Sequence, residues 1–431
     1  MKMKDSTIKK VVVVGLGYVG LPTLVAISKS NHYEVVGYDV DKNRISNIQK
    51  GKSPIEDEVV SNYLRENSIV VSSDDSALIN ADVYIICVPT PVYDDFTPNY
   101  SIVESVARNI AAFLKKGSHF VLESTVNPGT CNEIIKPILE ECSGLKAGID
   151  FNLAHCPERI NPGDSHWSIY NINRNIGSIN KKMNSQIADF YRTFISDAEI
   201  NEVETLEVAE ATKIVENTFR DINIAYVNEL AKSFDAMGID LVETIKAASN
   251  KPFGFMPHWP GAGVGGHCIA VDPYYLIQRA ALSGFDHRFL KLAREINNSM
   301  PEYTVERLVL SLNQIKKALK GAKITLLGLS YKPNLGDGRE SPAYKIKTIL
   351  NELGADLIIY DPYIKKDSTV TTLQAAVSEA DAIVLATAHR QFIDELPLLL
   401  KKSSVKVIID GRNCLDRSII NNQIIYKGIG R

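Results

Sequence analysis

The sequence predicts an α/β protein with two Rossmann-like doubly wound domains joined by a central helical domain that contains a long spine helix. Three observations support this prediction. Short apolar runs alternate with helical segments in the N-terminal part. The stretch from about Glu199 to Met237 has helical spacing and no strand signal. The C-terminal third repeats the strand pattern of the first. We place the domains at residues 1–198, 199–305 and 306–431.

The N-terminal domain begins with a β-branched run, Lys9–Val14, which ends at a glycine and predicts a buried parallel strand. Leu21–Ser30 continues with helical spacing, and Glu34–Tyr38 is a second strand closed by Asp39. Further strands are predicted at Val83–Val88 and His119–Glu123. Strands that alternate with helices predict a doubly wound parallel sheet.

Apolar residues recur at roughly helical spacing through the central segment: Leu206, Ala209, Ile214, Phe219, Ile222, Val227 and Leu230. They predict one long helix, or two in succession. A helix of this length packs against a partner subunit or against the core of its own chain. We therefore expect a homodimer that forms through the central helical domain.

The C-terminal third matches the beginning at three places in the same order, which predicts a second Rossmann-like domain. Lys323–Ser330 matches Val11–Gly17, Asp356–Asp361 matches Glu34–Asp39, and Ala380–Thr387 matches Ala81–Val88. Ser330 stands in place of Gly17, and Pro333 in place of Gly20. We expect this domain to bind a ligand other than an intact dinucleotide.

Composition excludes several classes. The 431 residues carry a net charge of −3, with 48 Lys and Arg against 51 Asp and Glu, so we expect no nucleic-acid or membrane partner. No apolar run approaches the roughly 20 residues of a membrane span, and the polar start does not resemble a signal peptide. The cysteines fit neither a zinc site nor a disulfide framework: Cys87, Cys131, Cys142, Cys156, Cys268 and Cys414. We expect no metal and a cytoplasmic location.

A dinucleotide fingerprint comes directly after the first strand. Gly15 permits the tight turn, Gly17 the close approach of a pyrophosphate, and Gly20 the packing of helix on strand. Asp39 ends the second strand, where a carboxylate accepts hydrogen bonds from ribose hydroxyls and repels a 2′-phosphate. These positions favour NAD over NADP.

Other residues near the fingerprint are candidates for the same site. Tyr18 and Val19 lie inside the fingerprint, and Thr90 and Pro91 come after a later strand. Arg44 lies over the adenine or ribose, or is an ordinary exposed helix residue.

A glycine-rich loop carries a candidate nucleophile. Four glycines in the six positions 261–266 precede Cys268, and Asp272 lies four residues further on. This is the layout of a nucleophilic thiol beside an acid/base group. The alternative is a glycine turn followed by a buried cysteine.

Further polar residues could complete such a site. Lys213 and Asn217 are four residues apart and share one helix face, so a cation and an amide could hold an oxyanion, or both could be solvated. Glu158 lies in a loop rich in turn residues after a predicted strand. Thr125 lies at a strand's carboxyl end, where α/β sheets bind ligands.

These motifs together resemble the UDP-glucose/GDP-mannose dehydrogenase family over nearly the whole chain. The matching segments are Gly15–Gly20, Glu123–Thr130, Pro157–Arg159, Glu210–Asn217, Gly265–Cys268 with Asp272, Tyr331–Pro333 and Asp337–Ser341. Family members oxidise the C6 hydroxyl of a nucleotide sugar to a carboxylate with two NAD per turnover. The resemblance implies an N-terminal NAD-binding domain, a central domain with the cysteine loop, and a C-terminal nucleotide-sugar-binding domain.

The resemblance also implies roles for individual residues. Lys213, with Asp272 and a water held by Thr125, would help to deprotonate the C6 hydroxyl. Cys268 would attack the aldehyde, and Lys213 and Asn217 would stabilise the oxyanion. Glu158 would assist water in hydrolysing the thioester. The substrate-binding set would comprise Glu158, Arg159, Lys213, Asn217, Gly265, His267, Lys332 and Arg339.

The resemblance narrows the substrate. Gly266–Ile269 with Asp272–Tyr275 is similar to the branch acting on UDP-N-acetylhexosamines, and Lys251–Pro257 to the UDP-N-acetylglucosamine subgroup. UDP-N-acetylmannosamine, UDP-N-acetylgalactosamine and UDP-glucose are the alternatives. The product would supply surface polysaccharide or glycan synthesis.

Two other functions use part of the same pattern. A β-hydroxyacid or 6-phosphogluconate type dehydrogenase has a Rossmann domain, a long helix and a Lys/Asn pair, but needs neither Cys268 nor a third domain. A non-catalytic sensor of NAD or nucleotide sugar would keep the fingerprint without the Cys268, Lys213, Asn217 and Glu158 set.

Overall fold

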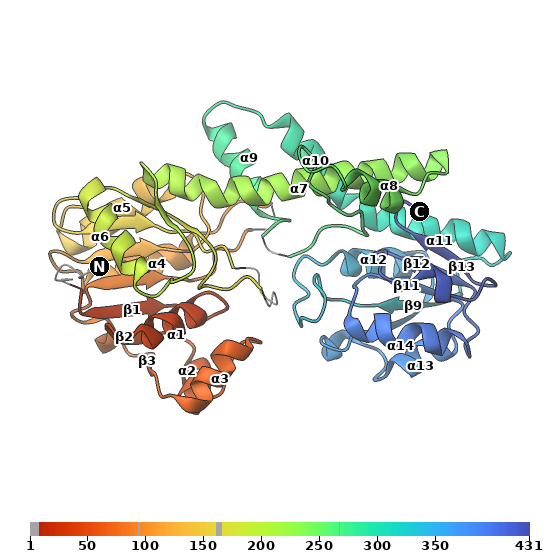
Figure 1. Cartoon of the computed structure of the whole chain (residues 1–431), viewed down its shortest axis with the longest axis horizontal. Helices are drawn as coiled ribbons and strands as arrows, with labels where there is room; N and C mark the ends of the chain where they lie inside the picture. Colours follow the sequence, from red (N-terminus) through yellow and green to blue (C-terminus); the bar gives the residue numbers. More distant parts are fainter. Residues whose placement is uncertain (1–7, 94, 161–165, 267) are drawn as a thin grey trace. The chain divides into compact units, whose positions relative to one another are not determined.

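The computed structural model describes residues 8–93, 95–160, 166–266 and 268–431 (Figure 1). They form two compact units. The first unit comprises the described residues of Met1–Glu216 and Tyr274–Ser283. The second comprises those of Asn217–Pro273 and Gly284–Arg431. Helix α7, Leu206–Met237, contributes residues to both units.

The first unit contains an eight-stranded sheet in the order β3-β2-β1-β4-β5-β6-β7-β8. The β3-β2-β1-β4-β5-β6 part has the strand order of a dinucleotide-binding fold. Neighbouring strands are parallel, except that β6 and β7 are antiparallel. The strands are β1 Lys10–Val14, β2 Glu34–Tyr38, β3 Val70–Ser72, β4 Val83–Ile86, β5 His119–Leu122, β6 Asn152–His155, β7 Arg174–Ser178 and β8 Ile200–Glu202.

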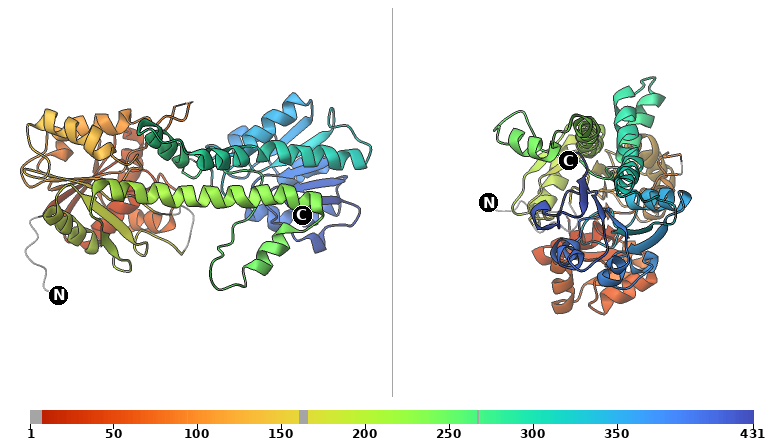
Figure 2. Two further views of the ribbon diagram at one scale, coloured as in Figure 1. Left: turned by 90° about the horizontal axis from the view of Figure 1, so that it is seen from above. Right: turned by 90° about the vertical axis from the view of Figure 1, so that its right-hand side faces the viewer.

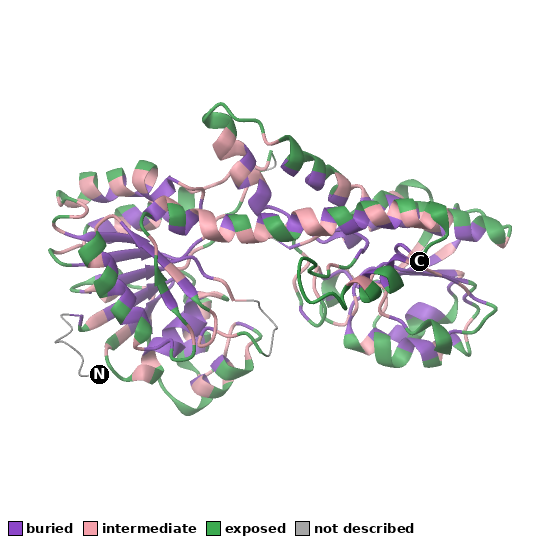
Figure 3. Ribbon diagram, turned by 45° about the horizontal axis from the view of Figure 1, so that its top comes forward, coloured by how far each residue is buried: buried purple, intermediate pink, exposed green. Residues whose placement is uncertain are grey.

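Helices cover both faces of this sheet. The strands are largely buried (Figure 3) because alternate side chains of each strand enter opposite cores. Val11 and Val13 pack in the core with α1 and α6, whereas Val12 and Val14 pack in the core with α4 and α5. The helices are α1 Gly20–Ser30, α2 Lys42–Gln49, α3 Glu58–Glu66, α4 Ser101–Ala111, α5 Lys136–Ser143 and α6 Lys181–Arg192.

The second unit contains a five-stranded parallel sheet in the order β10-β9-β11-β12-β13. One core joins the sheet to α11 and α12, and the other joins it to α13 and α14. The strands are β9 Lys323–Leu327, β10 Asp356–Tyr360, β11 Ala382–Leu385, β12 Val407–Asp410 and β13 Ile425–Gly428. The helices are α8 Leu241–Ala248, α10 Arg288–Asn298, α11 Met300–Gln314, α12 Pro342–Glu352, α13 Leu373–Ser378 and α14 Arg390–Leu400; α9, Asp272–Leu282, contributes to both units.

Local capping explains where several helices begin. The Asp41 side chain accepts hydrogen bonds from Asn43 N and Arg44 N, and so starts α2 directly after β2. The Ser341 side chain accepts one from Ala343 N, and Pro342 is the first residue of α12. Capping therefore fixes the helix after Asp39 and the helix after the Tyr331–Ser341 segment.

The fold class predicted from sequence is confirmed. The three matches that predicted the repeat fall on β9, β10 and β11, in the same sheet positions as β1, β2 and β4. The central segment contains one continuous helix of 32 residues, α7 (Figure 2). None of the described helices is both long and apolar enough to cross a membrane.

One part of the sequence prediction is wrong. The segment from Glu199 was expected to contain no strand, yet Ile200–Glu202 forms β8. β8 pairs with β7 in the register Arg174↔Ile200 at the edge of the sheet. A strand of three residues has too little pattern to be seen in sequence, so pairing with β7 decides its conformation. The predicted boundaries at 198/199 and 305/306 stay predictions.

Candidate functional site

The three fingerprint glycines lie in different environments. Gly15 has φ +88°, and a Cβ there would lie 2.9 Å from the Cys87 carbonyl oxygen. A Cβ on Gly20 would lie 1.9 Å from the Gly15 oxygen, so this glycine lets α1 begin against the turn. A Cβ on Gly17 would meet nothing within 4 Å. Gly15 and Gly20 are therefore required by packing, and Gly17 leaves open space beside the N-terminus of α1.

Asp39 is held against this turn. It is 4% exposed, and its Oδ2 accepts hydrogen bonds from Leu16 N and Arg44 Nη1, each at 2.8 Å. Its Oδ1 accepts one from Asp41 N at 2.9 Å. The carboxylate and Arg44 thus form an ion pair next to the fingerprint, at the position predicted for a ribose contact.

The remaining cofactor candidates lie around the carboxyl ends of the strands. Tyr18 is exposed, and Val19 is the residue before α1. Thr90 and Pro91 come after β4, and the Thr90 carbonyl accepts a hydrogen bond from Tyr275 Oη at 2.7 Å. Thr125 comes after β5, the neighbour of β4, and is half-buried. Carboxyl ends of parallel strands are where such sheets bind ligands.

Glu158 lies in the loop after β6 and is 4% exposed. Its Oε1 accepts a hydrogen bond from Ile160 N and lies 3.9 Å from Arg174 Nη2. Arg159 does not pair with it; Arg159 Nε donates to Glu216 Oε2 at 3.0 Å and Nη2 lies 2.6 Å from Glu216 Oε1. The partner of Glu158 is therefore a residue that sequence reasoning missed.

Lys213 is half-buried on α7, in the first unit. Burial, and to a smaller extent the charge of Lys213, lowers the pKa of His155 to about 3. His155 ends β6 and is 1% exposed, and within the described part of the chain its Nδ1 has no hydrogen-bond partner. Lys213 therefore lies within electrostatic reach of the strand end that precedes the Glu158 loop.

Another α7 residue holds the segment after Thr125. Glu210 is 1% exposed and accepts hydrogen bonds from Gly129 N at 2.5 Å and Cys131 N at 2.8 Å. Burial raises the pKa of Glu210 to about 7. Glu210 lies in the Glu210–Asn217 motif, but its spacing to residues 129–131 gave no sign of this contact.

In the second unit, Asn217 and Asp272 are brought together. Asn217 Nδ2 donates to Asp272 Oδ2 at 2.6 Å, although 55 positions separate the two residues. Asp272 is 3% exposed and begins α9, and its backbone N–H donates to the Cys268 carbonyl at 2.8 Å. The Cys268 backbone, Asp272 and Asn217 are thus linked by consecutive hydrogen bonds, and Cys268 itself is half-buried.

The glycines before Cys268 pack against the segment 331–342. A Cβ on Gly265 would lie 2.8 Å from the Glu340 carbonyl oxygen, and one on Gly266 would lie 2.8 Å from the Tyr331 ring. Gly266 N donates to the Arg339 carbonyl at 3.1 Å. At the other end of the loop, Gly261 N donates to Asn228 Oδ1 at 3.0 Å. The glycines therefore let the cysteine loop lie close to the C-terminal Rossmann-like domain.

The predicted phosphate contacts lie in that same segment. Arg339 is exposed and forms a two-point ion pair with Asp337, with Nε–Oδ1 at 3.0 Å and Nη2–Oδ2 at 2.6 Å. Its pKa is raised chiefly by this hydrogen bond and in smaller part by the charges of Tyr331 and Cys268. Lys332 is half-buried. His267, predicted to bind substrate, lies outside the described residues.

Three family models match consecutive parts of the chain. They describe the UDP-glucose/GDP-mannose dehydrogenase family: its NAD binding domain at residues 9–195, its central domain at residues 207–299 and its UDP binding domain at residues 325–417. The chain belongs to this family.

Individual relatives extend over the whole length. A UDP-N-acetyl-D-mannosamine dehydrogenase of Pyrococcus horikoshii is 35% identical over 427 residues, covering 98% of this chain and 99% of the relative. A UDP-N-acetyl-D-glucosamine 6-dehydrogenase of Pseudomonas aeruginosa is 35% identical over 396 residues, covering 90% and 92%. A solved UDP-D-ManNAc dehydrogenase structure from Pyrococcus horikoshii matches with a TM-score of 0.91 at 35% identity, covering 98% and 99%.

Membership of the family makes this protein an NAD-dependent nucleotide-sugar dehydrogenase. The open space at Gly17, between a turn held by Gly15 and a helix that begins at Gly20, fits the pyrophosphate of NAD. In the C-terminal domain the buried Ser330 stands in place of Gly17, and the matching family model describes this domain as a UDP binding domain.

Proposed function

We propose that this protein oxidises the C6 hydroxyl of a UDP-N-acetylhexosamine to the carboxylate by removing four electrons, with UDP-N-acetylglucosamine as the first candidate substrate. The observation that carries the proposal is the hydrogen-bonded set of Asn217, Asp272 and the Cys268 backbone beside the UDP-binding domain. Covalent oxidation of an aldehyde needs a thiol nucleophile with polar groups beside it, and here these are a carboxylate and an amide. The product would supply surface polysaccharide or glycan synthesis.

The first oxidation needs a base for the C6 hydroxyl. Lys213 serves this role, together with Asp272 and a water held by Thr125. The hydrogen bond from Asn217 fixes the orientation of the Asp272 carboxylate. NAD, when bound, accepts a hydride from C6 in each of the two oxidations.

The second oxidation is covalent. The Cys268 thiolate bonds to C6 of the aldehyde to give a thiohemiacetal, and Lys213 and Asn217 stabilise its oxyanion. Loss of hydride leaves a thioester on Cys268. Arg339 lies within electrostatic reach of Cys268, so a positive charge is near the sulfur when the thiolate attacks.

Hydrolysis of the thioester completes the cycle. Glu158 accepts a proton from the attacking water. Substrate binding is assigned to Gly265, His267, Lys332 and Arg339 with Arg159, and the last of these is oriented by Glu216. The ion pair with Asp337 occupies part of the Arg339 guanidinium, and only the rest of the group can meet a phosphate. We therefore expect Arg339 to contribute modestly to substrate binding.

A panel of UDP-sugars tests the substrate assignment. The Lys251–Pro257 motif favours UDP-N-acetylglucosamine, whereas the relative with the larger coverage is named for UDP-N-acetyl-D-mannosamine. Initial rates with both, and with UDP-N-acetylgalactosamine and UDP-glucose, rank the candidates by kcat/KM. A higher kcat/KM for UDP-glucose than for every N-acetylhexosamine would refute the proposed branch.

The stoichiometry of NADH tests the reaction class. We expect two NADH per UDP-sugar consumed, against one for a β-hydroxyacid type dehydrogenase and none for a sensor. Cys268→Ser should abolish complete oxidation because a hydroxyl is a far weaker nucleophile than a thiolate. Full conversion to the uronic acid by Cys268→Ser would exclude the covalent mechanism.

We also propose a homodimer through the central helical part. Four exposed apolar residues recur along α7 at spacings of seven and four, and so share one face: Val208, Val215, Phe219 and Tyr226. A second copy of the chain would cover this face. Sedimentation of wild type and Tyr226→Glu tests the proposal, with a dimer expected for the first and a shift toward monomer for the second.

A further inference from the structure

Arg174 lies between two buried carboxylates in the first unit. It begins β7, and its side chain is 1% exposed. Nη1 lies 3.7 Å from Glu123 Oε2, and Nη2 lies 3.9 Å from Glu158 Oε1. These separations are ion pairs rather than hydrogen bonds. Nη1 donates instead to the Pro157 carbonyl at 3.3 Å, and Nη2 has no hydrogen-bond partner among the described residues.

The surrounding groups decide where the charge resides. Two carboxylates against one guanidinium would leave a net negative charge in a buried site, which is costly. Burial raises the pKa of Glu123, and Tyr191 Oη donates to its Oε1 at 2.6 Å. Glu123 therefore takes up a proton at higher pH than an ordinary glutamate. When Glu123 is protonated, Glu158 is the carboxylate that pairs with the Arg174 guanidinium.

The other titratable groups that face the cluster from the described residues are neutral. Burial raises the pKa of Cys87 and of Cys156, the latter to about 12, and raises the pKa of Tyr191. His155 is uncharged above about pH 3. The positive charge that this cluster places beside Glu158 is therefore that of Arg174.

We propose that Arg174 is a positioning residue for hydrolysis of the thioester: it holds the turn that carries Glu158 and places a positive charge beside the buried Glu158 carboxylate. The inference rests on the proposed function, because it assumes that Glu158 accepts the proton of the attacking water. Arg174 acts through Glu158 and through the Pro157 carbonyl.

The chemistry requires an ionised Glu158. The oxygen of water bonds to the thioester carbon while a water proton passes to the Glu158 carboxylate. The carbon–sulfur bond then breaks, and the Cys268 thiolate is released with the electron pair. A protonated Glu158 cannot take that proton. Since no hydrogen bond joins Nη2 to Glu158, the carboxylate can turn toward water without breaking a hydrogen bond to Arg174; the one that it accepts from Ile160 N lies within its own loop.

Three variants test the proposal on the full-length protein. Arg174→Met removes the charge, Arg174→Lys keeps it, and Glu123→Gln removes the competing carboxylate. Enzyme is mixed with NAD and one equivalent of UDP-N-acetylhexosamine, and the loss of acyl mass from Cys268 is followed by quenched flow and intact-protein mass spectrometry from pH 5 to 9. Arg192→Met, an equivalent exchange at a half-exposed α6 arginine paired with Glu202, is the matched control.

Arg174→Met should slow hydrolysis at pH 7 at least tenfold and move the acidic limb of its pH profile upward by about 1–3 units, the effect of losing an opposite charge at this distance. Arg174→Lys and Arg192→Met should keep the limb near its wild-type position, and Glu123→Gln should leave it there or move it to lower pH. In Arg174→Met the rate of the two hydride transfers should change less than the rate of hydrolysis.

Two results would overturn the inference. One is an acidic limb of the Arg174→Met pH profile at the same pH as that of Arg174→Lys. The other is a movement of this limb to higher pH in Glu123→Gln, which would indicate that Arg174 acts on Glu123 instead. If Arg174→Met does not fold, Glu123→Gln and Arg174→Lys still decide the question. Glu158→Gln separates this test from the proposed function: it should accumulate acyl mass on Cys268, and absence of that mass refutes the hydrolytic role of Glu158 itself.

Discussion

The two Rossmann-like domains use the same strand–turn–aspartate arrangement with different results. Gly15 N donates to the Tyr38 carbonyl at 2.8 Å, and Gly328 N to the Tyr360 carbonyl at 2.9 Å. The two glycines have φ +88° and +89°. Asp39 accepts a hydrogen bond from Leu16 N at 2.8 Å, and Asp361 accepts one from Leu329 N at 2.6 Å. The backbone of the turn is thus the same in both.

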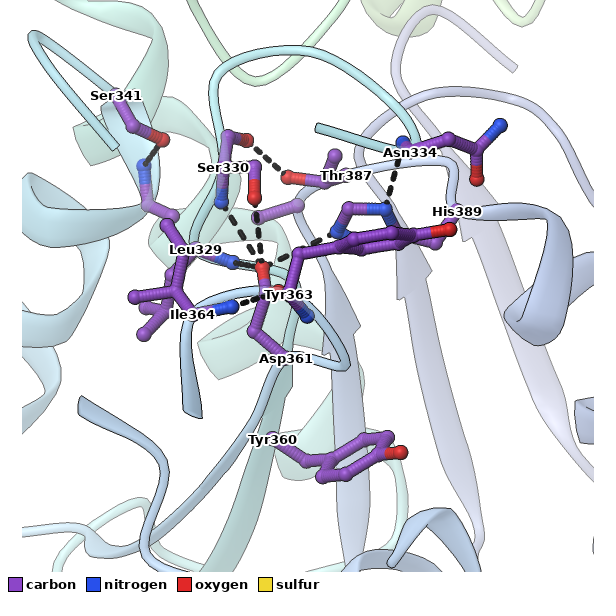
Figure 4. Close-up of polar contacts among 12 residues, drawn as sticks. Leu329, Ser330, Asn334, Ser341, Tyr360, Asp361, Tyr363, Ile364, Thr387 and His389 are labelled. Atoms are coloured by element: carbon purple, nitrogen blue, oxygen red, sulfur yellow. Dashed lines mark hydrogen bonds and ion pairs between the residues drawn. The ribbon is translucent and has the colours of Figure 1, made fainter. Parts of the chain in front are cut away.

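The two domains differ in the residues after the turn glycine. In the first domain the helix begins at Gly20, within the same turn, and Gly17 leaves open space. In the second, α12 begins at Pro342, and Ser330 takes the place of Gly17. Ser330 N and Oγ both donate to Asp361 Oδ2, at 3.0 and 3.1 Å (Figure 4).

The second aspartate is also enclosed more fully. His389 Nε2 lies 3.1 Å from Asp361 Oδ2, while His389 Nδ1 accepts a hydrogen bond from Asn334 N at 2.9 Å (Figure 4). Both side chains are fully buried. In the first domain the corresponding partner is Arg44, which is 35% exposed. The same turn and aspartate are therefore open at Gly17 in the first domain and filled by side-chain contacts in the second.

The largest expected effect compares the two aspartates. Asp361→Ala should lower the free energy of unfolding by about 3–5 kcal/mol, because it leaves a fully buried histidine and several backbone N–H groups without their acceptor. Asp39→Ala should cost about 1–3 kcal/mol, because fewer partners are lost. Urea unfolding of each variant measures the difference. An equal or smaller cost at Asp361 would contradict the comparison.

Acid should destabilise the first unit before the second, because the loss from two buried histidines exceeds the gain from the raised pKa of Glu210 in the same unit. Burial lowers the pKa of His155 to about 3 and of His119 to about 4, so the unfolded chain binds protons below about pH 6.5 that the folded unit does not. Stability is then present above pH 6.5 and is lost as pH falls toward these values, by about 2 kcal/mol per histidine at pH 5.

Asp361 responds at much lower pH. Burial alone would raise its pKa, but the hydrogen bond from His389 and those from backbone N–H groups lower it overall, so its contribution is lost only as pH falls through that lowered value. The chain has two tryptophans, Trp167 in the first unit and Trp259 in the second. Single-tryptophan variants followed during acid titration report each unit, and loss of the Trp259 signal first would refute the order. His155→Gln should reduce the acid sensitivity of the Trp167 signal.

Glycine exchanges test the openness of the first turn. Gly20→Ala should weaken NAD binding at least tenfold and destabilise the domain, since its Cβ would lie 1.9 Å from the Gly15 oxygen. A Cβ in Gly17→Ala would meet nothing within 4 Å, so the stability of the domain should stay unchanged. The same Cβ enters the space expected for the pyrophosphate, so NAD binding should weaken.

The matching exchange in the second domain is Ser330→Gly, which should confer no NAD binding because α12 starts too far along the chain. Calorimetric titration with NAD and thermal unfolding measure both properties. Unchanged NAD affinity in Gly17→Ala would place the pyrophosphate elsewhere.

The smallest expected effect concerns cofactor choice. Asp39→Ala removes a carboxylate that repels a 2′-phosphate and releases Arg44 from its ion pair, so the NAD to NADP ratio of kcat/KM should fall by about tenfold. The double variant with Arg44→Ala should recover less NADP activity than Asp39→Ala alone. A ratio that stays at the wild-type value would show that Asp39 is not at the ribose.

Helices and strands that are specified by residues close together in the chain could be predicted from the sequence. A β-branched run before a glycine predicted β1, the fingerprint predicted α1, Asp39 marked the end of β2, and helical spacing predicted the region of α7 as one helix or two. The repeat was visible because strand, turn and aspartate recur in order. Each of these features depends on residues within a few positions of one another.

Only the tertiary structure decided which distant residues meet. Asn217 bonds Asp272 across 55 positions, Arg174 sits between Glu123 and Glu158, and His389 bonds Asp361. β8 likewise exists because β7 offers it a paired edge. Such partners are set by how strands and helices pack, since a buried polar group must find whichever partner the fold brings within reach. No spacing along the chain records that choice.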